Sequence, residues 1–289
     1  MENPAFRIPG RAGFSDHEVN MPDESRVNEL VEAVGRKPAY RAMQIPESTL
    51  RDLAEKALAR QPSARLALKT VRRKLHQITA PYLGDPDYEQ ATRAIKSAFQ
   101  SGNSQSIQAC CQEILSSHTS TRERLSVLDG FYKRLFEVSG KPTSILDLAC
   151  GLNPLTFRWM GLPVSIHYLA YDIHAPRVAF LNEYFRLEGM QPAGCLRDIL
   201  IDPPTEGADV AFLFKEAHRF EEREAGCNRP LWRALKVKYL FVSLPPLSMS
   251  GRHDLTVKNR KLVTGITAPE NWRVNELVFP NEQVFAIEK

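Results

Sequence analysis

Apolar residues follow two different rhythms along the chain. They recur every three or four positions in residues 45–59 and again in 62–78, a spacing that places them on one face of a helix. A third such stretch, 118–138, opens with Ser120 and Glu123, the residue types of a helix capping box. The N-terminal part of the chain is therefore predicted to be helical.

Beyond residue 142 the apolar runs become short, as in buried strands. Five of them follow in order: TSILDLAC, SIHYLAYDI, GCLRDI, ADVAFLFKE and KYLFVSLPP. Helical patterns at 175–189 and 219–235 separate several of these runs, and strands alternating with helices predict a parallel, doubly wound α/β sheet. The last two runs, RVNELVFP and EQVFAIEK, meet at Pro280-Asn281. They predict a hairpin, so the sheet is expected to be mixed and mostly parallel.

These patterns predict three regions: a mobile tail over 1–25, an all-helical domain over 26–118 and an α/β domain over 119–289. Charge is distributed unevenly between them. Residues 26–74 hold twelve Lys and Arg but only five acids, whereas the whole chain carries a net charge of +4. The helical domain is therefore basic and the remainder is slightly acidic.

Cysteine usage and hydropathy indicate the cellular compartment of the protein. The chain has five cysteines, with no C-x-x-C pair and no His cluster at zinc spacing, which predicts reduced thiols, a cytoplasmic location and no metal. The first twenty residues lack the apolar core of a signal peptide. No apolar run approaches the length of a membrane helix.

Acidic residues follow the first three predicted strands. In SILDLACGLNPL, Asp147 lies near the end of the first strand and Gly151 in the loop after it. Asp172 ends the second strand and Asp198 the third. Ligands of open α/β sheets bind at the carboxyl ends of strands, where Asp172 could accept the hydroxyls of a ribose and Asp198 could meet an adenine amino group. The pattern favours a nucleoside ligand.

The first loop argues against a dinucleotide. It reads Cys150-Gly151-Leu152-Asn153-Pro154 and lacks the G-x-G-x-x-G motif that holds a pyrophosphate. Asp147 would repel phosphate and attract a cation. S-adenosylmethionine has an ammonium and a sulfonium and no phosphate, so we expect it as the cofactor. The alternative is that Asp147 and Asp172 only cap the strand ends.

Several motifs occur in the order found in one enzyme family. They are HTSTRERL, ILDLACGLNPL, YDIH, DILIDPP, FLFKE with EEREAG, and VSLPP with SGR. The chain resembles the aminoglycoside-resistance 16S rRNA (guanine-N7) methyltransferases, which modify the decoding site (helix 44) of the 30S subunit. YRAMQIPESTL and VRRKLHQITAPYL resemble the N-terminal helical domain of that family, so the similarity covers roughly residues 37–289.

The resemblance implies a Rossmann-like class I methyltransferase domain behind a helical domain that docks on rRNA. It assigns Arg124 to the methionine carboxylate, although an ordinary helix salt bridge is the alternative for this residue. It assigns the backbone of 149–151 to the amino-acid part of the cofactor. The expected cofactor-binding residues are Arg124, Asp147, Ala149, Cys150, Gly151, Asn153, Asp172, Ile173, Asp198 and Ile199.

Guanine N7 has an in-plane lone pair and no proton, so its methylation needs no general base. Catalysis is then expected from proximity, alignment and exclusion of water. Arg252 and Lys215 are the candidates that position the target base. The histidines are interpreted as surface or packing residues; those weighed are His174, His218 and His253.

Basic residues in two places are expected to contact phosphates, which give affinity without sequence information. The first group lies on the predicted helix 62–78 and the second on a predicted helix over 254–264. The proposed RNA-binding residues are Arg65, Lys69, Arg72, Arg73, Lys74, Lys258 and Lys261. A solvated basic face is the alternative for the second group.

The sequence departs from the family pattern near the presumed target pocket, at 253–256 and in FKEAH. Three other functions therefore stay open. They are methylation of another 16S rRNA atom such as an adenine N1, methylation of a small molecule, and ribosome association with cofactor binding but no catalysis. A monomer is expected, because the 30S subunit is a large and asymmetric target.

Overall fold

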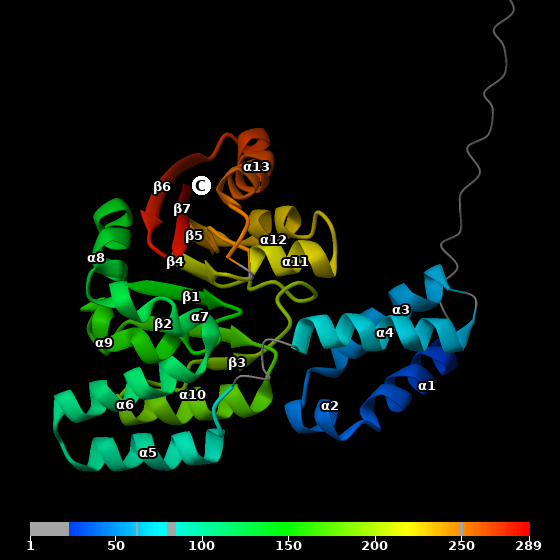
Figure 1. Cartoon of the computed structure of the whole chain (residues 1–289), viewed down its shortest axis with the longest axis horizontal. Coiled ribbons are helices and arrows are strands. Elements are labelled where there is room, and N and C mark those ends of the chain that lie inside the picture. Colours follow the sequence, from blue (N-terminus) through cyan, green and yellow to red (C-terminus); the bar gives the residue numbers. More distant parts are fainter. Residues whose placement is uncertain (1–22, 62, 80–84, 249–250) are drawn as a thin grey trace, which may run out of the picture.

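The computed structural model describes residues 23–61, 63–79, 85–248 and 251–289, and it consists of a small helical domain beside a larger α/β domain (Figure 1). The expected mobile tail, 1–25, lies almost wholly outside the described residues. The helical domain contains α1 (Glu24–Gly35), α2 (Pro38–Met43), α3 (Glu47–Arg60) and α4 (Ala64–Thr79). Val27, Leu53 and Leu75 are among the residues that form its separate core.

A seven-stranded sheet forms the centre of the α/β domain. The strands are β1 (Ser144–Leu148), β2 (His167–Asp172), β3 (Gly194–Leu196), β4 (Gly207–Phe214), β5 (Lys236–Leu244), β6 (Arg273–Phe279) and β7 (Glu282–Glu288). Their order is β3-β2-β1-β4-β5-β7-β6. The first five run parallel, and β7 and β6 add an antiparallel edge. The predicted Rossmann-like, mixed and mostly parallel sheet is confirmed.

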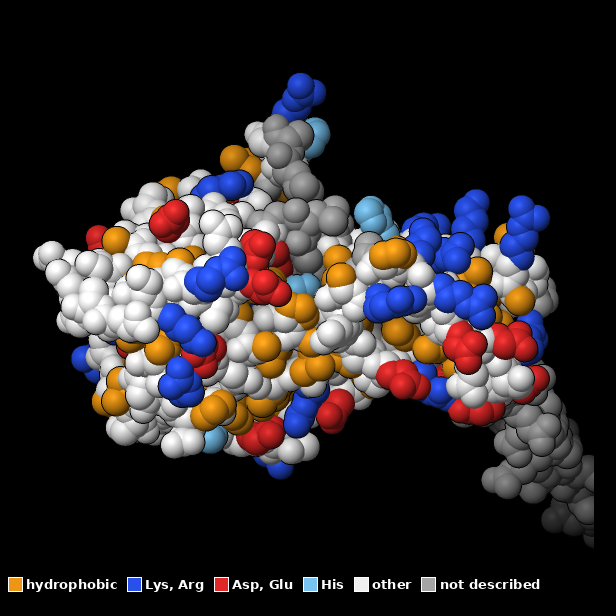
Figure 2. All heavy atoms as spheres, turned by 90° about the horizontal axis from the view of Figure 1, so that it is seen from below, with side chains coloured by type: hydrophobic (Ala, Val, Ile, Leu, Met, Phe, Trp, Pro, Cys, Tyr) orange, Lys and Arg blue, Asp and Glu red, His pale blue; other side chains and the backbone are white. Residues whose placement is uncertain are grey.

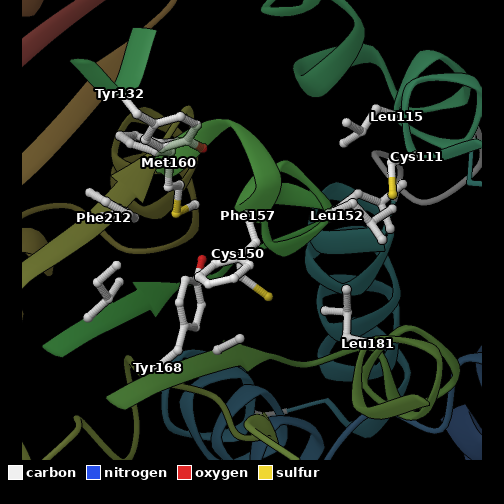
Figure 3. Close-up of a cluster of buried hydrophobic side chains, with 14 of the residues drawn as sticks. Cys111, Leu115, Tyr132, Cys150, Leu152, Phe157, Met160, Tyr168, Leu181 and Phe212 are labelled. Carbon is white, nitrogen blue, oxygen red and sulfur yellow. The ribbon is translucent and has the colours of Figure 1, made fainter. Parts of the chain in front are cut away.

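Helices cover both faces of the sheet. The core on one face includes residues of α5 (Tyr88–Gln100), α6 (Ser104–Ser117), α8 (Leu128–Ser139), α9 (Phe157–Met160) and α10 (Ala175–Leu187), with α5 packed against α6 and α10. The other face packs against α11 (Ala217–Arg223), α12 (Asn228–Ala234) and α13 (Thr256–Thr267). Alternate residues of β4 supply the two faces, with Phe212 on the first and Leu213 on the second, as the period of a strand requires. Figure 3 shows part of the first core, where Tyr132, Met160 and Phe212 lie together.

The buried cores divide the chain earlier than the sequence suggested. Helices α5 and α6 share a core with the sheet, through Ile95, Cys111 and Leu115 among others. The helical domain expected over 26–118 thus spans two cores. We propose that the domain boundary lies in the connection between α4 and α5.

The prediction of one continuous helix over 118–138 is wrong. The structure has instead α7 (Thr119–Arg122), the 3-10 turn η2 (Leu125–Val127) and α8. The predicted capping box does not form, because the Ser120 hydroxyl bonds to Nδ1 of His118 at 2.9 Å and Glu123 pairs with Lys215. The break between α7 and η2 falls at Arg124, which it turns toward the carboxyl ends of the strands.

Candidate functional site

A pocket lies at the carboxyl ends of the parallel strands, where the helical domain meets the α/β domain. Nine of the ten residues expected to bind the cofactor line it. They are Arg124, Ala149, Cys150, Gly151, Asn153, Asp172, Ile173, Asp198 and Ile199. The three expected acids are thus grouped at neighbouring strand ends, since β3, β2 and β1 are adjacent in the sheet.

The loop after β1 has an unusual backbone. Ala149 and Gly151 adopt φ angles of 48° and 54°, a region that is costly for a residue with a Cβ atom. The Gly151 N–H donates to a carboxylate oxygen of Asp172 at 3.0 Å. Ala149 is therefore strained, as backbone often is where main chain approaches a ligand.

Asp147 lies just beneath this loop and does not line the pocket. Its Oδ2 accepts hydrogen bonds from Nδ2 of Asn153 at 2.9 Å and from the Tyr168 hydroxyl at 2.7 Å. Burial raises the pKa of Asp147 to about 7, although these two bonds act to lower it. Asp147 is therefore linked to the pocket through Asn153, which lines it.

Asp172 is held by several donors. Its Oδ1 accepts the N–H of His174 at 2.9 Å, and its Oδ2 accepts the Gly151 N–H and Nη1 of Arg177 at 2.8 Å. Burial alone would raise the pKa of Asp172, but Arg177 and these hydrogen bonds keep the pKa below its usual value. The result is a fixed, ionised carboxylate, which suits an acceptor for ribose hydroxyls.

Asp198 is held from both domains. Thr49 of α3 donates its hydroxyl to Oδ2 at 2.9 Å, and Nη2 of Arg223 lies 2.6 Å from the same oxygen. The N–H of Leu200 donates to Oδ1 at 3.2 Å. Ile173 and Ile199 add apolar walls to this end of the pocket, which suits a flat base with a polar edge.

Arg124 already has a carboxylate partner inside the protein. Its Nε donates to Oε2 of Glu282 at 2.9 Å, its Nη2 lies 2.5 Å from Oε1, and its Nη1 donates to Asn153 at 2.6 Å. The guanidinium also lies between the rings of Phe131 and Phe214, 4.6 and 4.4 Å from their centroids. These hydrogen bonds use three of its five N–H groups, so the predicted bond to a methionine carboxylate needs one of the other two.

The two residues expected to position the target base lie outside the pocket lining. Lys215 follows β4 with a φ of 59°, is 5% exposed and pairs with Glu123. Arg252 is exposed on the loop that precedes α13. Their roles remain predictions.

Several pocket residues were missed by the sequence reasoning. Gln77 and Ile78 come from the end of α4, and Arg177 belongs to α10. Glu216 and Arg219 follow β4, with Nη1 of Arg219 3.1 Å from Oε1 of Glu216. Burial raises the pKa of Glu216 to about 7, against the opposing effect of Arg219. The sequence signals for this part of the chain were the FLFKE motif, the candidate Lys215 and the FKEAH departure.

The basic residues of α4 do not form one free stripe. Nη2 of Arg72 donates to the carbonyl of Ala33 at 3.4 Å, and Nζ of Lys74 donates to the carbonyl of Arg223 at 2.9 Å. The remaining basic residues proposed for RNA are exposed; they are Arg65, Lys69, Arg73, Lys258 and Lys261. Phosphate binding by Arg72 or Lys74 would require these internal bonds to change.

The geometry combines fixed acids, apolar walls and a glycine-containing loop in one pocket, and such a pocket suits a cationic nucleoside.

Among the described residues, no helix has the length and apolarity needed to cross a membrane.

The chain is similar to several known proteins. Residues 36–287 match the family model described as ribosomal RNA methyltransferase (FmrO). A protein of Frankia casuarinae named 16S rRNA (guanine(1405)-N(7))-methyltransferase is 32% identical over 92% of this chain and 95% of its own length. One of the same name from Micromonospora echinospora is 30% identical over 92% of this chain and 98% of its own.

Two solved structures of 16S rRNA methyltransferases are also similar to this chain. The 16S rRNA methyltransferase RmtF, crystallised with S-adenosyl-L-homocysteine, is 28% identical, with a TM-score of 0.75 over 92% of this chain and 99% of RmtF. The 16S rRNA methylase RmtB is 25% identical, with a TM-score of 0.72 over 91% of this chain and 98% of RmtB.

Proposed function

The chain belongs to the ribosomal RNA methyltransferase (FmrO) family, and from this premise we propose that it methylates N7 of a guanine in 16S rRNA with S-adenosylmethionine as the methyl donor. The relatives from Frankia casuarinae and Micromonospora echinospora are named for guanine 1405. The corresponding guanine of the decoding site, in helix 44 of the 30S subunit, is the proposed target. Its methylation is proposed to confer resistance to aminoglycosides that bind there.

The pocket at the strand ends is the observation that carries this proposal. Asp172 would hold the ribose, Asp198 and Ile199 the adenine, and the backbone of 149–151 the amino-acid part. Arg124 would bind the methionine carboxylate with the N–H groups that Glu282 and Asn153 leave. The bound cofactor supplies a methyl group on an electron-poor sulfonium, and RmtF was crystallised with the corresponding product.

The pocket does not need to supply a base, because guanine N7 carries no proton. His118 lines the pocket, and burial lowers its pKa to about 4, so it is neutral near pH 7. The protein's contribution would be to align N7 with the methyl group and to exclude water.

The target base must leave its helix before it can react. N7 lies on the major-groove edge, which is deep and narrow in A-form RNA, so the base is expected to flip into the site. Arg252, on the exposed loop before α13, would contact the flipped base or its phosphate. Lys215, which is buried and paired with Glu123, would act on the flipped base through its charge.

Docking on the subunit would use the basic surface of the helical domain. Figure 2 shows Lys and Arg side chains gathered on one side of that domain. Arg65, Lys69 and Arg73 of α4 are exposed and would contact phosphates. Because phosphates carry no sequence information, the assembled 30S subunit is the proposed substrate, bound by a monomer in the cytoplasm.

The direct test is methyl transfer from labelled S-adenosylmethionine to purified 30S subunits, with protein-free 16S rRNA as the comparison. We expect one methyl group per 30S subunit and little on free rRNA. Incorporation into neither RNA would favour a ribosome-associated protein without catalysis. Equal incorporation into both would contradict recognition of the assembled subunit.

A further inference from the structure

The helical domain bonds directly to a carboxylate of the cofactor pocket. Thr49, in the first turn of α3, is fully buried and donates its hydroxyl to Oδ2 of Asp198 at 2.9 Å. Asp198 itself is 3% exposed and lines the pocket. A hydrogen bond from a neutral donor to a buried carboxylate is of the stronger kind, and this one crosses the domain boundary.

Other polar contacts hold the two domains together around this bond. Arg223 of α11 lies 2.6 Å from Asp198 and 3.8 Å from Asp52 of α3. Nζ of Lys56 lies 2.8 Å from Asp52 and 2.5 Å from Glu224. These residues form a continuous network from α3 to the pocket.

The C-terminal half of α4 completes the contact. Nζ of Lys74 donates to the carbonyls of Glu222 and Arg223, at 2.6 and 2.9 Å. Gln77 and Ile78 form part of the pocket wall. The pocket wall is therefore complete only while α4 is seated on α11.

The second acid of the pocket is tied to the connection between the domains. Asp85 precedes α5 and accepts two hydrogen bonds from Nη2 of Arg177, at 2.8 and 2.6 Å. Nη1 of Arg177 in turn donates to Asp172. Asp198 is thus bonded directly by Thr49 of α3, and Asp172 is linked through Arg177 to Asp85, which precedes α5.

We propose that Thr49 is a positioning residue of the cofactor site: the seated helical domain orients Asp198 through the Thr49 hydroxyl, and cofactor affinity depends on that seating. This inference rests on the proposed function, because it takes the pocket as the adenosine site. It also implies the reverse effect, since a cofactor bound against Asp198 would favour the seated position of the domain that docks on RNA.

The test compares three variants of the full chain in calorimetric titrations with S-adenosylhomocysteine. Thr49→Val keeps the side-chain shape and removes the hydroxyl, Thr49→Ser keeps the hydroxyl, and Ser48→Ala removes an exposed hydroxyl from the same turn. We expect Thr49→Val to weaken binding about fivefold to tenfold, a loss in the range of one hydrogen bond of ordinary net strength. Thr49→Ser and Ser48→Ala should bind within about twofold of the unsubstituted chain.

Kinetics separate positioning from general loss of structure. Thr49→Val should raise the KM for S-adenosylmethionine and leave kcat at saturating cofactor near that of the unsubstituted chain. Unchanged binding by Thr49→Val, or an equal loss in Thr49→Ser, would overturn the inference while leaving the proposed function intact. If the unsubstituted chain binds no S-adenosylhomocysteine, the proposed function itself fails.

A variant at another contact between the domains tests the same inference if Thr49→Val does not fold. Lys74→Met removes only the ammonium that joins α4 to the end of α11. We expect it to weaken S-adenosylhomocysteine binding about twofold to threefold by loosening the seated domain. Unchanged affinity in this variant would contradict the dependence on seating.

Discussion

The guanidinium of Arg124 and the carboxylate of Glu282 form a bidentate ion pair that is almost fully buried, with exposed side-chain fractions of 3% and 2%. Arg124 precedes η2 and Glu282 begins β7, so the pair joins the start of the α/β domain to its last strand. Burial alone would raise the pKa of Glu282, but Arg124 holds the pKa below its usual value. The pair stays ionised and fixes the one cation of the pocket that is assigned to the methionine carboxylate.

Removing Glu282 should destabilise the fold, because Arg124 would be left as an unpaired buried charge. We expect Glu282→Ala to lower the free energy of unfolding by about 3 kcal/mol or more, measured by urea denaturation. Glu288→Ala is the matched control on the same strand. Its partner Arg273 lies 3.7 Å away and is 85% exposed, so a loss below about 1 kcal/mol is expected. Equal losses in the two variants would contradict the importance of burial.

Replacement of Asp172 should weaken cofactor binding. Asp172→Asn keeps the shape but removes the charge that would accept the ribose hydroxyls. We expect S-adenosylhomocysteine to bind at least about tenfold more weakly in calorimetry. Asp202→Asn, at an acid 68% exposed near the end of β3, should bind normally. A normal affinity of Asp172→Asn for S-adenosylhomocysteine would contradict the assignment of Asp172 to the ribose.

The pH dependence of cofactor binding follows from Glu216 and Asp147, whose pKa values are each raised to about 7. Both carboxyls lose protons as the pH rises from 6 to 8, and their negative charge then attracts the sulfonium. S-adenosylmethionine should therefore bind more tightly at pH 8 than at pH 6. S-adenosylhomocysteine lacks the sulfonium charge and should change less, and Glu216→Gln should reduce the difference between the two ligands. Tighter binding of S-adenosylmethionine at pH 6 would contradict this account.

Stability of the free protein should move in the opposite direction. A carboxyl whose folded pKa lies above its unfolded pKa favours folding below the unfolded value, and that stabilisation is lost as the pH rises through the folded value. The contribution of Asp147 and Glu216 is thus lost between about pH 4 and pH 7. Urea denaturation of Glu216→Gln should show a shallower pH dependence over this range than the unsubstituted chain.

Reversing charge on the exposed side of α4 should weaken docking on the 30S subunit without changing cofactor binding. We expect the combined change of Arg65, Lys69 and Arg73 to Glu to lower affinity for 30S subunits by at least about tenfold and to flatten its salt dependence. S-adenosylhomocysteine affinity should stay unchanged. Lys133→Glu, an exposed lysine on α8, is the control. Retained 30S affinity in the triple variant would place the docking surface elsewhere.

Local pattern predicted the sheet and the acids at its edge, because strand periodicity and turn chemistry are encoded over a few residues. Asp172, Gly151 and Asp198 follow directly from that reasoning. The partners that fix these groups could not be found in this way. Thr49 reaches Asp198 from 149 positions away, and Glu282 reaches Arg124 from 158; such contacts arise only when the domains pack. The prediction of one helix over 118–138 failed for a related reason, because Glu123 bonds to Lys215 instead of capping that helix.

The most direct measurement of the central claim is the position and chemistry of the methyl group on 30S subunits treated with this protein and S-adenosylmethionine. Borohydride and aniline cleave RNA at N7-methylguanine, whereas N1-methyladenine stops reverse transcriptase without such treatment. We predict a single new cleavage at one guanine of helix 44 and no new unaided stop. An unaided stop at an adenine, or the absence of any modification in 30S particles, would contradict the account.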